Sequence, residues 1–271
     1  MKTKMIRSAI APPARPGGFT IMELLVVIGV IGIVASLLLP ALARTKSRAF
    51  SLICLNNLKQ QQVSWHLYAG DNEDAAAPNN SFSSLSAPNT TDTPWVTGEG
   101  ASWSPGIAPL DTTFNNLETG VLFPYNHAHG IYHCPADLST VSNNPAQLRT
   151  RSYCMNISLN CSDATNSFRK ATQINRPNPS DLFVWIDTQE QDIWDATFGI
   201  FSADSTYAGD WLDLPADRHQ QGANLVFADG HAEHWRWSAP KQFVTRWEPA
   251  QNAGDLADLQ RLQSASKNGL D

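Results

Sequence analysis

The sequence predicts an α+β protein in which one long N-terminal helix precedes a small antiparallel β-sheet domain with long loops. Residues 24–43 carry no charged side chain, which is typical of a long apolar helix. Apolar runs flank Asp229-Gly230, and this is a strong hairpin signal because such a turn needs positive φ at its centre. Residues 71–118 are rich in Asn, Ser, Thr, Pro and Gly without sustained periodicity, which indicates long loops and a few short strands.

The apolar segment is long enough to cross a membrane. At about 1.5 Å per residue, residues 24–43 would span about 30 Å, the thickness of a bilayer's hydrocarbon core. The alternative is the buried helix of a globular core, but helices that are hydrophobic on all sides are uncommon in soluble domains. We therefore expect a transmembrane helix.

The residues before this segment resemble an export signal with an unusual cleavage site. Four basic side chains and no acidic one precede the apolar core. A secretory signal has its small-residue cleavage site after that core, whereas here Gly17-Gly18 lies before it. Cleavage after Gly18 would remove the basic leader and keep the helix.

Glu23 is the costly residue of this region. A carboxylate at the edge of an apolar segment is disfavoured by a few kcal/mol unless it lies near the headgroups or is paired. One partner would be the amine that cleavage frees on Phe19 of a neighbouring copy. The alternative is a glutamate at the membrane surface, close to the positive end of its own helix.

The stretch Gly18-Phe19-Thr20-Ile21-Met22-Glu23-Leu24-Leu25-Val26-Val27-Ile28 resembles the class III signal of type IV pilins and type II secretion pseudopilins. The resemblance implies a pilin-like fold and cleavage between Gly18 and Phe19 by a prepilin peptidase, which also N-methylates Phe19. It assigns Glu23 to subunit registration during assembly. Pro40 matches a helix-bending proline of the family, and physically a proline there kinks or locally melts a helix.

The same resemblance implies a function and a location. The chain would be a structural subunit, not an enzyme, of a type II secretion pseudopilus or type IV pilus-like filament, and its partners would be other pilin or pseudopilin subunits. It would cross the inner membrane once, with a cytoplasmic N-terminus and a periplasmic or extracellular C-terminal domain. Charge barely decides this orientation, because basic residues also follow the apolar segment. The alternative function is a membrane-anchored extracytoplasmic binding module or metal-dependent hydrolase that uses the pilin export route.

The expected organisation follows from these boundaries. Residues 1–18 form the cleaved leader, residues 19–69 the long helix and residues 70–271 the globular domain. After Pro40 the helix becomes amphipathic, with an apolar stripe that packs on the domain. The side chains expected in that stripe are Leu52, Leu55, Leu58 and Trp65.

The domain itself contains several strand signals. The expected strands are residues 182–186, 223–228, 231–237 and 242–247. A short terminal helix is expected at residues 255–263.

Four cysteines follow the apolar segment: Cys54, Cys134, Cys154 and Cys161. In an exported domain they allow three disulfide connectivities. We favour Cys54 with Cys134, which would tie the helix to the domain, and Cys154 with Cys161, which would close a short loop. Zinc competes poorly here, because no Cys-x-x-Cys pair exists and the spacings are irregular.

His219 is followed by nine residues and then Asp229-Gly230, which resembles the His-x9-Asp-Gly signature of a large group of pilin-like proteins. Residues 56–60 and 134–137 also resemble motifs of that group. In a structural interpretation Asp229 and Gly230 form the turn, and His219 bonds to nearby backbone. In a functional one, His219, Asp229 and His231 bind zinc or manganese.

A calcium site is a weaker alternative, with oxygens from Asp187, Glu190 and Asp192 at spacings that do not match an EF-hand loop. No cofactor is otherwise expected. The sequence contains no Gly-x-Ser-x-Gly, His-Glu-x-x-His or P-loop motif. Loss of the leader would change the formal charge from −6 to −10, and this acidic balance argues against a nucleic-acid partner.

Overall fold

The computed structural model describes residues 20–79, 93–98, 101–105, 111–142, 144–161, 164, 166–193, 195–242 and 247–267. The predicted cleavage position, Gly18 and Phe19, lies outside these residues. The chain divides into two compact units, residues 1–45 and residues 46–271. Helix α1 (Ile21–Asp71, 51 residues) runs through both, which confirms the expected long helix.

The start of α1 is closed by a reciprocal pair of hydrogen bonds. The Thr20 amide donates to Glu23 Oε2 at 2.8 Å, and the Glu23 amide donates to Thr20 Oγ1 at 3.2 Å. This is a capping box, which satisfies two backbone donors that a helix start leaves free. Glu23 therefore has a partner within its own chain, at the N-terminal end of its own helix.

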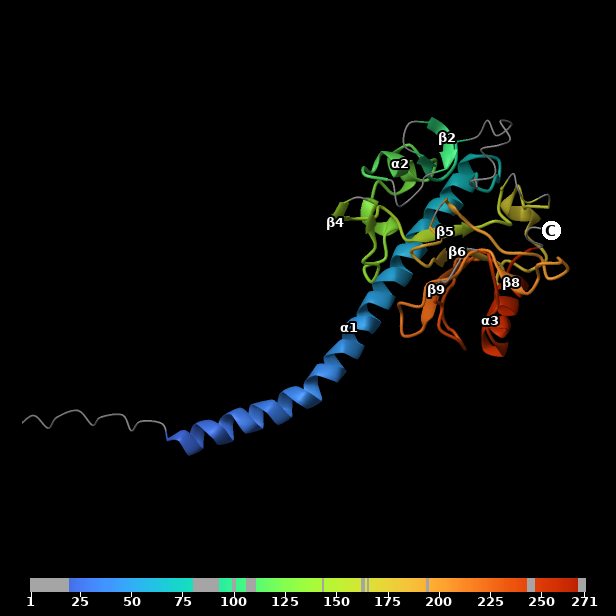
Figure 1. Ribbon diagram of the computed structural model, residues 1–271. Helices are drawn as coiled ribbons and strands as arrows, with labels where there is room; N and C mark the ends of the chain where they lie inside the picture. The colour runs from blue at the N-terminus through green and yellow to red at the C-terminus, as the bar shows by residue number, and fades with distance from the viewer. Residues whose placement is uncertain are drawn as a thin grey trace, which may run out of the picture. The chain divides into compact units, whose positions relative to one another are not determined.

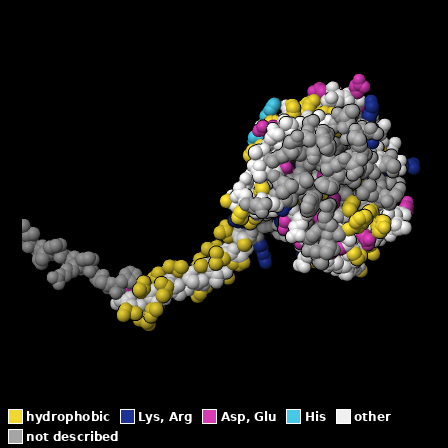
Figure 2. Space-filling model, turned by 45° about the horizontal axis from the view of Figure 1, so that its top comes forward, with side chains coloured by type: hydrophobic (Ala, Val, Ile, Leu, Met, Phe, Trp, Pro, Cys, Tyr) yellow, Lys and Arg dark blue, Asp and Glu magenta, His cyan; other side chains and the backbone are white. Residues whose placement is uncertain are grey.

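The first part of α1 is apolar and exposed. It is long and apolar enough to cross a membrane, and none of its most apolar window is buried. Hydrophobic side chains run along this helix in the space-filling view (Figure 2). The helix continues without a break through Pro40, so the local melting considered at this position is not seen.

The centre of the second unit is a five-stranded sheet in the order β10-β9-β6-β5-β7. Strands β5, β6 and β9 of this sheet are labelled in Figure 1. All pairs are antiparallel except β5 with β7. Its strands are β5 (Tyr153–Asn156), β6 (Phe183–Asp187), β7 (Thr197–Phe198), β9 (Gly222–Phe227) and β10 (Ala232–Arg236).

The sheet confirms the predicted hairpin and central strand. Strands β9 and β10 pair in antiparallel register from Val226 with Ala232 to Gly222 with Arg236. Gly230 has φ of 94°, the positive value that the turn requires. All residues of β6 are buried, as expected for the apolar run at 182–186.

Short elements accompany this sheet, and those in the described part of residues 71–118 are two short strands, as expected, and one short helix. Residues 243–246 of the strand expected at 242–247 lie outside the described part of the chain, and the strand seen nearby is β11. The short elements are β1 (Thr97–Gly98), β2 (Ala101–Pro105), α2 (Asn115–Glu118), β3 (Thr140–Val141), β4 (Asn144–Leu148), β8 (Asp210–Trp211) and β11 (Glu248–Pro249), with 3-10 helices at Phe123–Tyr125, His129–Tyr132 and Ala171–Gln173.

The second part of α1 packs on the domain with a face slightly different from the expected one. Its buried residues include Cys54, Leu58 and Trp65, whereas Leu52 is 67% exposed and Leu55 half-buried. Residues 54, 58 and 65 share one helical face, while residue 52 lies about 160° away from residue 54 around the axis. The expected stripe was therefore right at Leu58 and Trp65 and wrong at Leu52.

Helix α3 (Ala253–Ser264) confirms the predicted terminal helix and begins at a side-chain cap: Asn252 Oδ1 accepts from the Asp255 amide at 3.0 Å. We expect Asn252→Ala to lower the free energy of unfolding by about 1 kcal/mol, because this amide loses its partner. Urea denaturation would measure the change. Asn252→Ser is the matched control, since serine also caps, and equal losses in both variants would contradict the capping role.

Candidate functional site

Four side chains from distant segments meet inside the second unit. Cys54 comes from α1, Cys134 from the segment after the 3-10 helix at His129–Tyr132, Asp187 from the end of β6, and His219 from the loop before β9. All four are buried, and one potential ligand atom from each lies within 4.8 Å of the others. We call this group the Cys-Asp-His cluster.

The atoms of the cluster converge on a common point. His219 Nε2 lies 3.3 Å from Cys134 Sγ and 3.2 Å from Asp187 Oδ2. Cys54 Sγ lies 3.8 Å from the same Asp187 oxygen. His219 Nδ1 is buried and has no hydrogen-bond partner among the described residues. The imidazole is therefore held through a single nitrogen.

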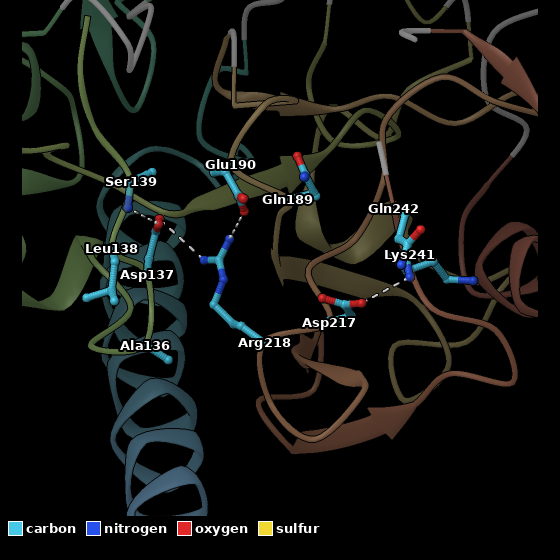
Figure 3. A pocket seen from close by; sticks show the side chains of 10 residues that line it. All are labelled: Ala136, Asp137, Leu138, Ser139, Gln189, Glu190, Asp217, Arg218, Lys241 and Gln242. Carbon is cyan, nitrogen blue, oxygen red and sulfur yellow. Dashed lines mark hydrogen bonds and ion pairs between the residues drawn. The ribbon is translucent and has the colours of Figure 1, made fainter. Parts of the chain in front are cut away.

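Arg218 fixes the carboxylate of the cluster from the other side. Its Nη1 lies 3.0 Å from Asp187 Oδ1 and 3.3 Å from Asp137 Oδ2, and its Nη2 lies 3.3 Å from Glu190 Oε2. The Arg218 pairs with Asp137 and Glu190 border an open pocket (Figure 3). Since Arg218 engages Oδ1 of Asp187, the Oδ2 atom is left to face the two cysteines and His219.

Burial and the contacts within the cluster shift the pKa values of Cys134, His219 and Cys54. Burial opposes the thiolate of Cys134, yet hydrogen bonds with Cys54 and His219 lower its pKa to about 7. Burial also opposes the imidazolium of His219, but hydrogen bonds with Asp187 and Cys134 raise its pKa to about 9. Burial raises the pKa of Cys54 well above its usual range. The contacts within the cluster therefore shift the pKa values of the two thiols in opposite directions.

Arg218 also affects the pKa of a neighbouring carboxylate, that of Asp137. Burial opposes ionisation of Asp137, but Arg218 and a hydrogen bond from Ser152 hold its pKa below the usual value. Ser152 Oγ donates to Asp137 at 2.6 Å and accepts from the Cys134 amide at 3.0 Å. This chain of contacts links the backbone of Cys134 to Arg218.

The structure does not bring His219, Asp229 and His231 together, so the interpretation in which these three residues bind one metal ion is wrong. His231 Nδ1 pairs with Asp229 Oδ1 at 2.6 Å on the exposed hairpin turn. His219 precedes β9 and Asp229 follows it, so a strand of six residues, about 20 Å long, separates them. The turn interpretation of Asp229 and Gly230 agrees with the structure, while the His219 side chain bonds to Cys134 and Asp187.

The calcium set Asp187, Glu190 and Asp192 is not assembled around one point. Asp187 and Glu190 both bind Arg218, a cation that already occupies the space between them. Asp192 Oδ2 instead accepts from the Leu214 amide at 2.8 Å. Of the three, Asp187 alone belongs to the Cys-Asp-His cluster.

The two predicted disulfides are not formed in the structure, where all four cysteines are free thiols. The sequence nevertheless predicted the approach of Cys54 to Cys134, which both belong to the cluster. Cys154 lies in the interior of β5, and its Sγ faces the Asp195 carbonyl at 3.7 Å instead of Cys161.

Together these observations define a class: an α+β domain with an antiparallel-rich sheet, preceded by an apolar helix that could cross a membrane. No known protein-family model, curated protein or solved structure matches the chain.

Proposed function

We propose that this protein is a pilin-like structural subunit that a prepilin peptidase processes and that assembles into a type II secretion pseudopilus or type IV pilus-like filament. The observation that carries the proposal is α1, a helix whose apolar first part is exposed and whose second part is built into a folded domain. Such a helix can have two roles. It anchors the subunit in the inner membrane before assembly, and it packs against other subunits in the filament afterwards.

Small residues support close packing of these helices. Gly29 and Gly32 lie in the exposed part of α1, and a Cβ added at either would meet no atom within 4 Å apart from its chain neighbours and the adjacent helix backbone. In lipid, helices associate through close backbone approach at small residues. Both glycines are therefore free to contact neighbouring subunits.

Glu23 is the proposed registration residue, and its capping box gives it a competing role within the chain. The two roles are separable, because glutamine at this position can still complete a capping box but cannot pair as an anion. Under the proposal, the carboxylate pairs with the methylated amine of Phe19 on an adjacent subunit. Glu23→Gln and Glu23→Ala should then fail alike.

The test compares membrane and sheared filament fractions of cells that produce each form, by immunoblot. We expect membrane content close to that of the wild type for both variants. We expect the filament fraction to fall at least about ten-fold, the change that accompanies loss of an interaction of about 1.4 kcal/mol. Glu118→Gln, on the surface of the domain, is the matched control.

Two outcomes would contradict this role. If Glu23→Gln assembled like the wild type while Glu23→Ala did not, the residue would act only as a helix cap. If both variants assembled normally, Glu23 would not register subunits at all.

A further inference from the structure

Three separations in the Cys-Asp-His cluster match those between the ligands of a tetrahedral metal ion, and all four potential ligand atoms lie within 4.8 Å of one another. Ligand atoms at about 2.0–2.3 Å from a tetrahedral zinc ion lie about 3.3–3.8 Å from one another. The separations that involve Asp187 Oδ2 are 3.2 Å to His219 Nε2 and 3.8 Å to Cys54 Sγ, and Cys134 Sγ lies 3.3 Å from the imidazole nitrogen.

A catalytic Cys-His-Asp arrangement does not explain these contacts. In such a triad the carboxylate orients one imidazole nitrogen and the nucleophile meets the other. Here the Cys134 sulfur and the Asp187 oxygen both meet Nε2 of His219, and Nδ1 has no partner among the described residues. Two acceptors directed at one nitrogen are expected where all three atoms bind a common cation.

A disulfide between Cys54 and Cys134 explains only part of the cluster. It would satisfy the two sulfurs but would give Asp187 Oδ2 and His219 Nε2 no reason to converge on them. Asp187 is also oriented by Arg218, which binds Oδ1 and leaves Oδ2 directed at the sulfurs. Partners that orient a ligand in this way are typical of metal sites.

Charge balance favours a divalent cation. Two thiolates, one carboxylate and a neutral imidazole carry three negative charges, of which a divalent ion would balance two, while Arg218 is shared between Asp187 and two further carboxylates. Two sulfurs, one imidazole nitrogen and one carboxylate oxygen form a donor set that suits zinc rather than calcium or magnesium.

We propose that Cys54, Cys134, Asp187 and His219 bind one zinc ion. With four protein donors, all buried, the site has no open position for substrate and is structural rather than hydrolytic. The ion joins α1 to three other segments of the unit formed by residues 46–271, and so fixes the second part of the helix on the domain. This role is independent of filament assembly.

The test uses the full chain, solubilised in mild detergent from the membranes of the cells that make it. Mass-spectrometric metal analysis should find one zinc per chain. Exchange for Co²⁺ should give intense tetrahedral d–d bands and a thiolate-to-cobalt charge-transfer band. The cobalt spectrum identifies sulfur ligation in the wild-type chain, so this readout does not depend on whether any variant folds.

Substitutions then assign the ligands. Cys54→Ser and His219→Gln should each reduce the zinc content from one per chain to near zero. Cys161→Ser replaces a buried cysteine outside the cluster, and His231→Gln a histidine of the exposed turn, so both should retain one zinc. Zinc that stays in the first pair of variants would overturn the assignment.

Alkylation of the unfolded, unreduced chain distinguishes a zinc site from a disulfide between Cys54 and Cys134. Four labelled cysteines are expected after removal of zinc. A chain that carries no metal, or one in which Cys54 and Cys134 are joined and only the other cysteines label, would overturn the proposal.

Discussion

Replacement of Trp65 by alanine should lower the free energy of unfolding by about 3–5 kcal/mol, the loss typical of a large aromatic side chain removed from a core. Trp65 is fully buried although it lies on α1, and it belongs to the same core cluster as Trp185 of the central strand β6. Alanine would leave a cavity between the helix and the sheet domain. The effect is large because close-packed interiors relax only partly around such a void.

Urea denaturation of the full chain in detergent, followed by tryptophan fluorescence, would measure this loss. Every tryptophan of the sequence lies beyond residue 45, so the signal reports on the second unit. Val63→Ala is the matched control, because Val63 is on the same helix but 57% exposed, and we expect a change within about 0.5 kcal/mol. If Trp65→Ala lowered the free energy of unfolding as little as Val63→Ala, the helical face that carries Trp65 would not pack on the domain.

Lys241→Met should be comparably destabilising, by about 3–5 kcal/mol, because it breaks a buried ion-pair network. Lys241 Nζ lies 2.7 Å from Asp255 Oδ1 and 2.7 Å from Asp258 Oδ2, and its side chain is fully buried. The ammonium also lies 4.9 Å from the centre of the Trp211 ring. Methionine fills the space but leaves two buried carboxylates without their cation.

The same denaturation experiment measures this effect. Lys59→Met, at an exposed position of α1, should change stability by no more than about 0.5 kcal/mol. Adding Asp255→Asn and Asp258→Asn to Lys241→Met should recover part of the loss, since the uncompensated charges disappear. If Lys241→Met alone were as stable as the wild type, the network would not hold the C-terminal helix as the structure indicates.

Local sequence patterns were sufficient to predict the helices, the strand and the hairpin whose residues carry a clear short-range signal. The long helix, the strand at 182–186, the terminal helix and the hairpin at Asp229-Gly230 all follow from periodicity, apolar runs and turn residues. The buried face of α1 was harder, because leucines at 52, 55 and 58 suggest a stripe, while the domain covers the face that carries Cys54, Leu58 and Trp65.

The Cys-Asp-His cluster could not be predicted from spacing, because its four members come from separate parts of the chain. Two of them, Cys134 and His219, are the first residues of the motifs at 134–137 and 219–230, and the favoured disulfide placed Cys54 beside Cys134. The missing information was tertiary: Asp187 ends a strand, and the loop before β9 turns His219 toward it. By contrast, Asp229 and His231 are near His219 in sequence, yet strand β9 separates them from it.

The central claim is that this chain is processed as a prepilin, and the mature N-terminus tests it most directly. Peptide mass spectrometry of the protein isolated from membranes should find N-methylated Phe19 as the first residue, so that Glu23 is the fifth. An intact N-terminus at Met1, or a terminus beyond the apolar segment, would contradict the account.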